Sequence, residues 1–341
     1  MKESKDNPVN KYRRDWQRGD YAYPAAYITR SRVVVCAKIK AGSGVFRVKL
    51  KAYKRSGRLA GLKSEYIYLK KSGKIGEKNE RFQATRYTPK KIRSFYQVWE
   101  WYLERIKLKG KTPVFSREHI ATTMNKIYII LNEPQHPWGT FEEHAPWLRV
   151  VDIACREAES QSIDRRAAAR ITRYLYNSKK INAFYTTESN YSRNNSPSSG
   201  FRLADFLNKM STNVGKMNCY DMGKTLVTFS NAVGCRLDLM YFKSVNIDPI
   251  RLNRVRPVGW DTNRGNPENF ENHAFTELEN KIFDASIKVN RSGIRKYFRP
   301  IWITGISKGR YLRLLVKKAK ITEPEITEFE IETKKPKRKI H

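Results

Sequence analysis

The stretch HAFTELENKIFDASIKV, residues 273–289, is interpreted as two short strands, HAFTEL and KIFDASIKV, joined by a two-residue turn at Glu279-Asn280. In that register Asp284 lies opposite Phe275 and diagonal to His273, on the same face of the hairpin. Diagonal neighbours lie roughly 7 to 8 Å apart at the backbone, close enough for an imidazole and a carboxylate to meet. A three-residue turn would put the two on opposite faces, and both could also be ordinary surface residues.

A second segment, NCYDMGKTLV at residues 218–227, follows a turn and carries apolar side chains at helical spacing. Cys219 is therefore predicted at the start of a helix, where unpaired N–H groups and the aligned peptide dipoles favour a thiolate. Its backbone N–H would then be a natural donor to an oxyanion. A buried structural cysteine remains the alternative. Cys155 falls on an apolar helical stripe, and Cys36 and Cys235 have no candidate base nearby in sequence, so these three are interpreted as structural.

The surrounding elements predict an α+β domain, with helices first and antiparallel strands after them. Apolar spacing predicts helices over 147–158, 163–175 and 201–210, with Ser162 as the N-cap of the second, and strands are predicted over 237–242, 273–278, 282–289 and 301–306.

The N-terminal part has a pattern of strands and turns. Alternating segments at 33–39, 46–52 and 65–70, separated by turns, predict a basic antiparallel β-sandwich, while 97–103 fits either a strand or a helix. The predicted domains are a polar arm (1–30), a basic β-sandwich-like domain (31–120), a thiol domain (121–318) and a charged tail (319–341).

The net charge of +35 exceeds what solubility requires and is uneven. Residues 1–120 hold 31 Lys and Arg against 10 Asp and Glu, and the remaining residues hold 37 against 23. This charge favours an anionic partner, either an acidic protein surface or non-specific nucleic acid. The basic side chains predicted to contact it are Lys38, Lys40, Arg47, Lys49 and Lys51.

Four short motifs occur in order along the second half of the chain: NCYDMG at 218–223, NAVGC at 231–235, NHAFTE at 272–277 and FDAS at 283–286. Together they resemble the transglutaminase-like (papain-like) cysteine enzyme superfamily, in a bacterial member with an N-terminal β-sandwich-like domain. The resemblance covers roughly residues 145–310. It implies a papain-like core of helices followed by an antiparallel sheet, as in peptidases, deamidases, cross-linking enzymes and acyltransferases.

The resemblance also implies site residues. Cys219 would be the nucleophile, His273 the base and Asp284 the residue that orients the base. The second oxyanion donor lies upstream of the cysteine in this superfamily, and Asn218 and Tyr191 are the candidates. A protein or peptide substrate is expected, and no cofactor or metal, since no paired cysteines or zinc-ligand spacings occur.

Three functions remain open at this stage. The first is thiol-dependent acyl transfer, and the second is a non-catalytic basic module that binds an anionic partner. The third is a basic effector or toxin carried by a bacterial delivery apparatus. No run of about 18 apolar residues occurs, and residues 1–16 lack the apolar stretch of a secretory signal. Synthesis in the cytoplasm is expected, with any export by a non-classical route.

Overall fold

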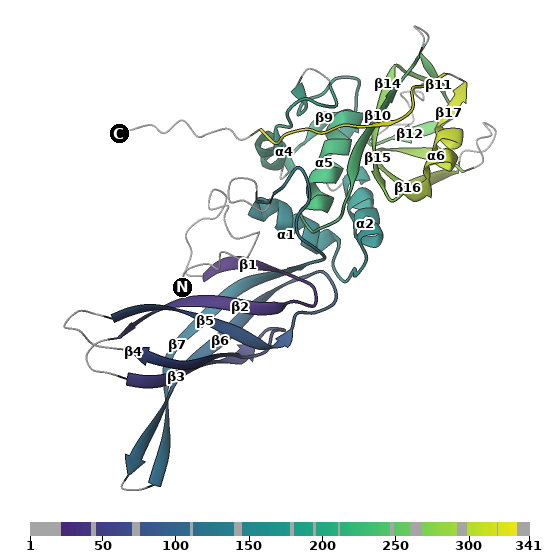
Figure 1. The fold of residues 1–341 in the computed structure, drawn as a ribbon. Helices are drawn as coiled ribbons and strands as arrows, with labels where there is room; N and C mark the ends of the chain where they lie inside the picture. Colours follow the sequence, from purple (N-terminus) through teal and green to yellow (C-terminus); the bar gives the residue numbers. More distant parts are fainter. Residues whose placement is uncertain are drawn as a thin grey trace, which may run out of the picture. The chain divides into compact units, whose positions relative to one another are not determined.

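The chain forms two compact units, which Figure 1 shows as ribbons. The first comprises residues 1–133 and 139–162, and the second comprises 134–138 and 163–341. The computed structural model describes residues 22–41, 46–69, 76–109, 112–139, 145–177, 181–193, 196–210, 212–245, 249–259, 268–291, 299–318 and 320–332.

The first unit is built on one seven-stranded sheet. Its strands are β1 (Ala22–Ile28), β2 (Arg32–Ala41), β3 (Phe46–Ser56), β4 (Leu62–Leu69), β5 (Gly76–Tyr87), β6 (Arg93–Lys109) and β7 (Thr112–Ile130). They lie in the order β1-β7-β6-β3-β4-β5-β2, and β1 runs parallel to β7 while the other neighbours are antiparallel. Residues 97–103, where a strand and a helix were both open, lie within β6.

A single core joins the two ends of this sheet. Val33 of β2, Trp99 of β6 and Ile127 of β7 belong to one buried cluster. The Tyr27 hydroxyl of β1 donates to the Val34 carbonyl of β2 at 3.3 Å, although β1 and β2 stand at opposite ends of the strand order. The sheet therefore curves around its core. The predicted sandwich of two sheets is wrong for the described strands, because one curved sheet produces the same alternation of inward and outward side chains.

The limits of the first unit also differ from those predicted. Strand β1 begins inside the segment 1–30, which was predicted as a polar arm and whose first 21 residues lie outside the described part of the chain. The boundary predicted at residue 120 falls inside β7. Helix α1 (Leu148–Glu157) joins this unit as well, and Lys126 Nζ of β7 lies 2.5 Å from Asp152 Oδ1 on the helix.

The second unit mixes helices and sheets. Its helices are α2 (Asp164–Tyr176), α4 (Leu203–Met210), α5 (Cys219–Asn231) and α6 (Lys308–Leu315). The strands of its main sheet are β10 (Asp238–Lys243), β12 (Val255–Pro257), β14 (Asn272–Leu278), β15 (Lys281–Asn290), β16 (Pro300–Ser307) and β18 (Glu325–Ile326). They lie in the order β12-β15-β14-β10-β18, and β16 also pairs with β15. Smaller pairings join β8 (Ala183–Tyr185) to β9 (Gly215–Met217), and β11 (Ile250–Leu252) to β13 (Asn269–Phe270) and β17 (Val316–Lys318). Three helices thus precede an antiparallel sheet, as the α+β class predicts.

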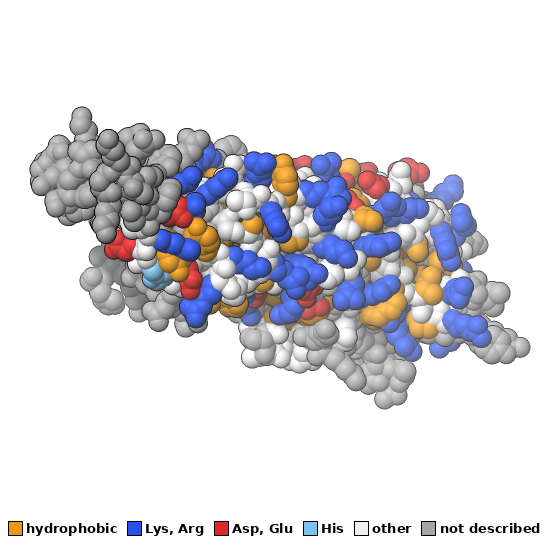
Figure 2. Space-filling model, turned by 90° about the horizontal axis from the view of Figure 1, so that it is seen from below, with side chains coloured by type: hydrophobic (Ala, Val, Ile, Leu, Met, Phe, Trp, Pro, Cys, Tyr) orange, Lys and Arg blue, Asp and Glu red, His pale blue; other side chains and the backbone are white. Residues whose placement is uncertain are grey.

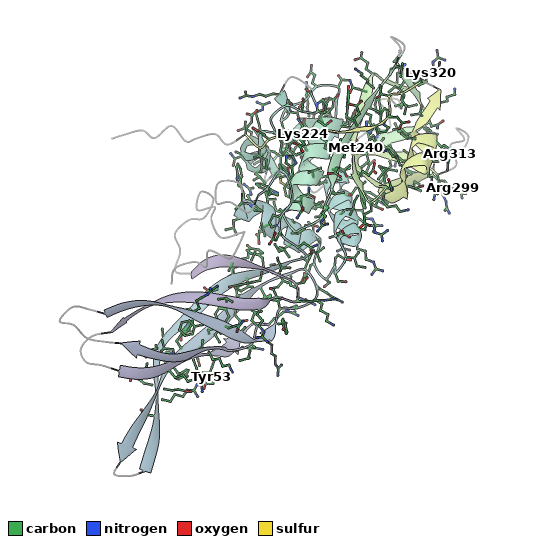
Figure 3. All side chains as sticks on the ribbon, in the orientation of Figure 1. Tyr53, Lys224, Met240, Arg299, Arg313 and Lys320 are labelled. Carbon is green, nitrogen blue, oxygen red and sulfur yellow. The ribbon has the colours of Figure 1, made fainter. Side chains whose placement is uncertain are left out.

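Helix α5 lies at the centre of the second unit. All of its residues are buried, and it packs against α2, β14 and β15. Gly223 permits a close approach to the sheet, since a Cβ there would lie 2.7 Å from Leu239 Cδ1. Lys224, labelled in Figure 3, is fully buried and donates to the carbonyls of Ser196 and Ser199 at 3.0 and 2.7 Å. The helix therefore also anchors the loop around these serines.

Much of the predicted charged tail packs against the second unit. Ile326 of β18 pairs with Met240 of β10, and Phe329 is buried with its ring near Phe201. Residues 320–332 of the predicted charged tail therefore include packed positions, and residues 333–341 lie outside the described part.

Among the described residues, no helix is long and apolar enough to span a membrane.

Candidate active site

Cys219 is the first residue of α5. The preceding residue, Asn218, is the N-cap, and its Oδ1 accepts a hydrogen bond from the Asp221 N–H at 3.1 Å. Strand β9 leads directly into this cap and starts at Gly215, whose φ of +76° suits glycine. The Cys219 side chain thus lies at the positive end of the helix dipole, and the residue is 4% exposed.

The hairpin of β14 and β15 has the register predicted from its sequence. Leu278 pairs with Lys281, and Thr276 pairs with Phe283. Glu279 and Asn280 have φ values of +52° and +60°, the conformation of a two-residue type I′ turn. The turn therefore has two residues and not three, and His273 and Asp284 lie on one face.

His273 and Asp284 form a fully buried hydrogen-bonded pair. His273 Nε2 lies 2.9 Å from Asp284 Oδ2. Because a carboxylate only accepts, Nε2 carries the proton and donates it. In the neutral imidazole this leaves the acceptor lone pair on Nδ1, which is buried and forms no hydrogen bond within the described residues.

His273 is not the only hydrogen-bond donor to Asp284. The backbone N–H and the hydroxyl of Ser286 both donate to Oδ1, at 2.7 and 2.6 Å. The Tyr311 hydroxyl of α6 donates to Oδ2 at 2.7 Å and lies 3.0 Å from His273 Nε2. Burial alone would raise the pKa of Asp284, but the charge and hydrogen bond of His273, with Ser286 and Tyr311, lower it. The carboxylate is therefore ionised and fixed in orientation.

The same pair sets the charge of His273. Burial alone would lower the pKa of the imidazole, but the charge and hydrogen bond of Asp284, and then the Cys219 thiol, raise it to about 9. Phe270 stacks on the imidazole ring with its centroid 5.2 Å away. An imidazolium is consequently stable at neutral pH in an otherwise apolar surrounding.

Tyr185 is a further residue at the thiol. It pairs in register with Met217, two residues before Cys219. Burial, and then the nearby Cys219 thiol, raise the pKa of Tyr185 well above its ordinary value, so the hydroxyl keeps its proton and can donate it.

The two residues proposed from sequence as oxyanion donors, Asn218 and Tyr191, form structural hydrogen bonds instead. The Tyr191 hydroxyl donates to the Val214 carbonyl at 2.6 Å, and burial first, with Asp221 next, raises its pKa to about 12. Asn218 caps α5 through its Oδ1. The structure thus brings Cys219, His273 and Asp284 together and places Tyr185 beside the thiol.

Two of the remaining cysteines are buried away from this cluster. Burial, followed by Asp152, raises the pKa of the Cys155 thiol, and burial, followed by Asp164, raises that of Cys235. The side chain of Cys36 lies outside the described part of the chain. A raised thiol pKa disfavours the nucleophilic thiolate.

The predicted basic face is only partly described. Lys51 Nζ lies 2.6 Å from Glu104 Oε2, so this cation is already paired within the sheet. Lys49 also interacts with other groups of the protein. The side chains of Lys38, Lys40 and Arg47 lie outside the described part. Figure 2 nevertheless shows Lys and Arg side chains predominating over Asp and Glu on the face that it displays.

Sequence reasoning missed Tyr185, Tyr311 and Ser286. Ser286 follows Asp284 by two positions on the quoted hairpin, and shared strand parity would have placed it on the same face. Tyr311 lies in KGRYLRLL, a short segment that was not predicted as a helix. Among the described residues, no group of three or more His, Cys, Asp or Glu is arranged to hold a metal ion.

No protein-family model matches the chain, and no curated protein matches it. Among solved structures, the chain is similar to the crystal structure of red sea bream transglutaminase, with 10% sequence identity and a TM-score of 0.34. The similarity covers 88% of this chain and 51% of the other, so the chain spans about half the length of that transglutaminase. A likeness at this level says nothing about activity, which has to come from the chemistry of the site.

Proposed function

We propose that the second unit is a thiol-dependent acyl-transfer enzyme of the peptidase, deamidase or transglutaminase type. Cys219 is the nucleophile, His273 the general base and acid, and Asp284 the residue that orients and charges His273. The observation that carries the proposal is the buried 2.9 Å bond from His273 Nε2 to Asp284, in a ring whose pKa the Cys219 thiol also raises. This arrangement directs the Nδ1 lone pair to the proton of a thiol.

The proposed mechanism begins with transfer of the Cys219 proton to Nδ1 of His273, whose pKa of about 9 reflects the stabilisation of the imidazolium by Asp284. The Cys219 sulfur attacks the carbonyl carbon of an amide, a C–S bond forms, and the carbonyl electrons move onto oxygen. When the C=O bond re-forms, the C–N bond breaks, and His273 gives its proton to the departing nitrogen.

The thioester is then resolved by water or by an amine. The incoming nucleophile loses its proton to His273, and the second tetrahedral intermediate expels the Cys219 sulfur. Water produces a peptidase or a deamidase, whereas an amine produces a cross-linked product. In both halves the oxygen carries negative charge, and the proposed donors to it are the Cys219 backbone N–H and the Tyr185 hydroxyl.

Alkylation of the native protein with iodoacetamide across pH, followed by peptide mapping, tests the nucleophile. Cys219 is expected to be alkylated faster than the other cysteines. His273→Ala should abolish that reaction. Cys155 and Cys235 are internal controls, because burial suppresses their ionisation. Labelling of these two in preference to Cys219, or labelling of Cys219 that ignores His273, would remove the proposal.

The acyl acceptor is tested separately. Casein and a fluorescent primary amine are incubated with the wild type and with Cys219→Ser, and both amine incorporation and ammonia release are recorded. Incorporation that depends on Cys219 assigns transfer, and ammonia release without incorporation assigns deamidation. New amino termini in the casein assign peptidase activity.

A further inference from the structure

Three arginines form a row along the exposed side of α2. Arg166, Arg170 and Arg173 are all exposed and follow one another at spacings of four and three residues. Such neighbours share a helix face with their Cβ atoms roughly 5 to 6 Å apart. Arg165, the fourth arginine of the helix, instead pairs with Glu279 at 3.6 Å.

The C-terminal end of α2 leads to two more cations. Tyr176 follows Arg173 by three residues and donates from its hydroxyl to the Arg256 carbonyl at 2.7 Å. Lys288 Nζ lies 4.6 Å from the centroid of the Tyr176 ring and 3.5 Å from that of Trp302. Arg256 and Lys288 are directly opposed in the pairing of β12 with β15. The cations thus continue from the helix onto the sheet.

This arrangement brings like charges together. Directly opposed like charges on neighbouring strands destabilise a sheet. Burial, with Arg256 next, lowers the pKa of Lys288. Among the described residues, Arg166, Arg173 and Lys288 form no ion pair with a carboxylate. An anion bound along the row would meet these three cations.

We propose that this basic row binds the phosphate backbone of nucleic acid without reading its sequence. Its members are Arg166, Arg170, Arg173, Arg256 and Lys288. Nucleic acid fits better than an acidic protein, because every nucleotide carries a charge and a regular row of cations meets several phosphates at once. Guanidinium groups also match phosphate oxygens two at a time. The row lies in the second unit, whereas the charge of the sequence pointed to the first. Its binding does not depend on thiol chemistry.

The test is binding of the full chain to a fluorescent single-stranded oligonucleotide, followed by fluorescence anisotropy over a range of salt concentrations. The row variant combines Arg166→Gln, Arg170→Gln, Arg173→Gln and Lys288→Gln. Glutamine and arginine have similar helix propensities, so α2 is retained. The matched control combines Lys54→Gln, Arg58→Gln, Lys90→Gln and Lys91→Gln, four exposed cations of the first unit, and has the same net charge.

The wild type should bind with an affinity that falls steeply with salt. Each phosphate contact on a single strand contributes about 0.7 to the slope of log K against log salt, so the row variant should have a slope shallower by about 3. Its affinity near 0.1 M salt should fall at least about tenfold, while the control stays close to the wild type. Replacing each arginine by lysine, and Lys288 by arginine, should restore the slope.

Several results would overturn the proposal. An equal loss in the row variant and the control would mean that overall charge alone is responsible. Polyglutamate that competes as well as unlabelled oligonucleotide would assign the row to acidic protein. No salt-dependent binding by the wild type would remove it. Circular dichroism of each variant separates a lost contact from a lost fold.

Discussion

Tyr311 and His273 bond to the same oxygen of one carboxylate. The Tyr311 hydroxyl donates to Asp284 Oδ2 at 2.7 Å, and His273 Nε2 lies 2.9 Å from that oxygen and 3.0 Å from the hydroxyl. Both side chains are fully buried. Tyr311 therefore acts as a positioning residue: it stabilises the ionised form of Asp284 and limits rotation of the imidazole.

Replacement of Tyr311 by phenylalanine should destabilise the fold in a pH-dependent way. The loss of a donor to a buried carboxylate costs about 1 to 3 kcal/mol at neutral pH. A carboxyl whose folded pKa is depressed contributes stability above its unfolded pKa of about 3.9 and loses it as pH falls through the folded pKa. Because the variant has a higher folded pKa for Asp284 and the same unfolded pKa, the stability difference between wild type and variant should shrink as pH falls below about 3.9. Urea unfolding at pH 7 and at a pH below about 3.9 measures both effects.

Tyr191→Phe is the control for this experiment. It also removes a buried hydroxyl, but one that donates to the neutral carbonyl of Val214. Its unfolding free energy should fall by the same amount at both pH values. If the two variants lose the same stability at both pH values, Tyr311 has no special relation to Asp284.

The charge of His273 makes a second prediction about stability at alkaline pH. The folded pKa of about 9 lies above the ordinary histidine value of 6.5. The stability from this pair is therefore complete below pH 6.5 and is lost as pH rises through 9. Asp284→Asn removes the charge that raises the pKa, so the stability difference between wild type and variant should shrink by on the order of 3 kcal/mol over that range. Urea unfolding of both proteins from pH 6 to 10 measures it.

The difference in stability between wild type and Asp284→Asn is the quantity to compare, because Lys224 changes the stability of both proteins with pH in the opposite direction. Burial lowers the pKa of Lys224 to about 8, against the ordinary lysine value of 10.5. Folding stability then rises with pH between these values, since the unfolded chain keeps the proton longer. The Lys224 contribution is common to both proteins and cancels. A stability difference that stays constant from pH 6 to 10 would contradict the prediction.

The proposed role of Tyr185 is tested by turnover. Tyr185→Phe removes the hydroxyl beside the thiol but leaves the backbone pairing with Met217. If that hydroxyl donates to the oxyanion, kcat should fall about 10² to 10³-fold, the usual cost of one such donor. Tyr191→Phe should retain most of its turnover. A large loss in Tyr191→Phe with an intact fold would return the oxyanion role to that residue.

The geometry of the hairpin could be predicted because it depends on local rules. A two-residue turn and strand parity together place His273 and Asp284 on one face, and the structure has that turn. The start of α5 was predictable for a similar reason, since the turn before Cys219 precedes a run of helical spacing. Such features need no knowledge of distant parts of the chain.

The remaining features depend on long-range packing. Tyr311 reaches Asp284 from a helix 27 residues further along the chain, and no periodicity connects them. Alternation in the first unit identified half-buried strands, but it could not show that they form one curved sheet. In the tail, acidic residues alternate with Phe329 and Ile331. Their charge led to the prediction of a charged tail, although Phe329 is buried and Ile331 forms a β-bridge with Phe201.

The packed tail makes the last prediction. Phe329 is 2% exposed, and its ring faces Phe201 and His136 with centroids 6.3 and 5.9 Å away, while Lys224 Nζ lies 5.6 Å from it. Phe329→Ala should therefore lower the unfolding free energy by about 3 to 5 kcal/mol, the usual cost of deleting a buried aromatic ring.

The same segment provides a matched control. Ile326 is 64% exposed although it pairs with β10, so Ile326→Ala should change the unfolding free energy by less than about 0.5 kcal/mol. Urea unfolding followed by tryptophan fluorescence compares the two variants. Equal and small effects would mean that residues 320–332 do not pack in solution. A large effect confined to Phe329→Ala would establish that this segment is part of the fold that holds α5, and with it Cys219, in place.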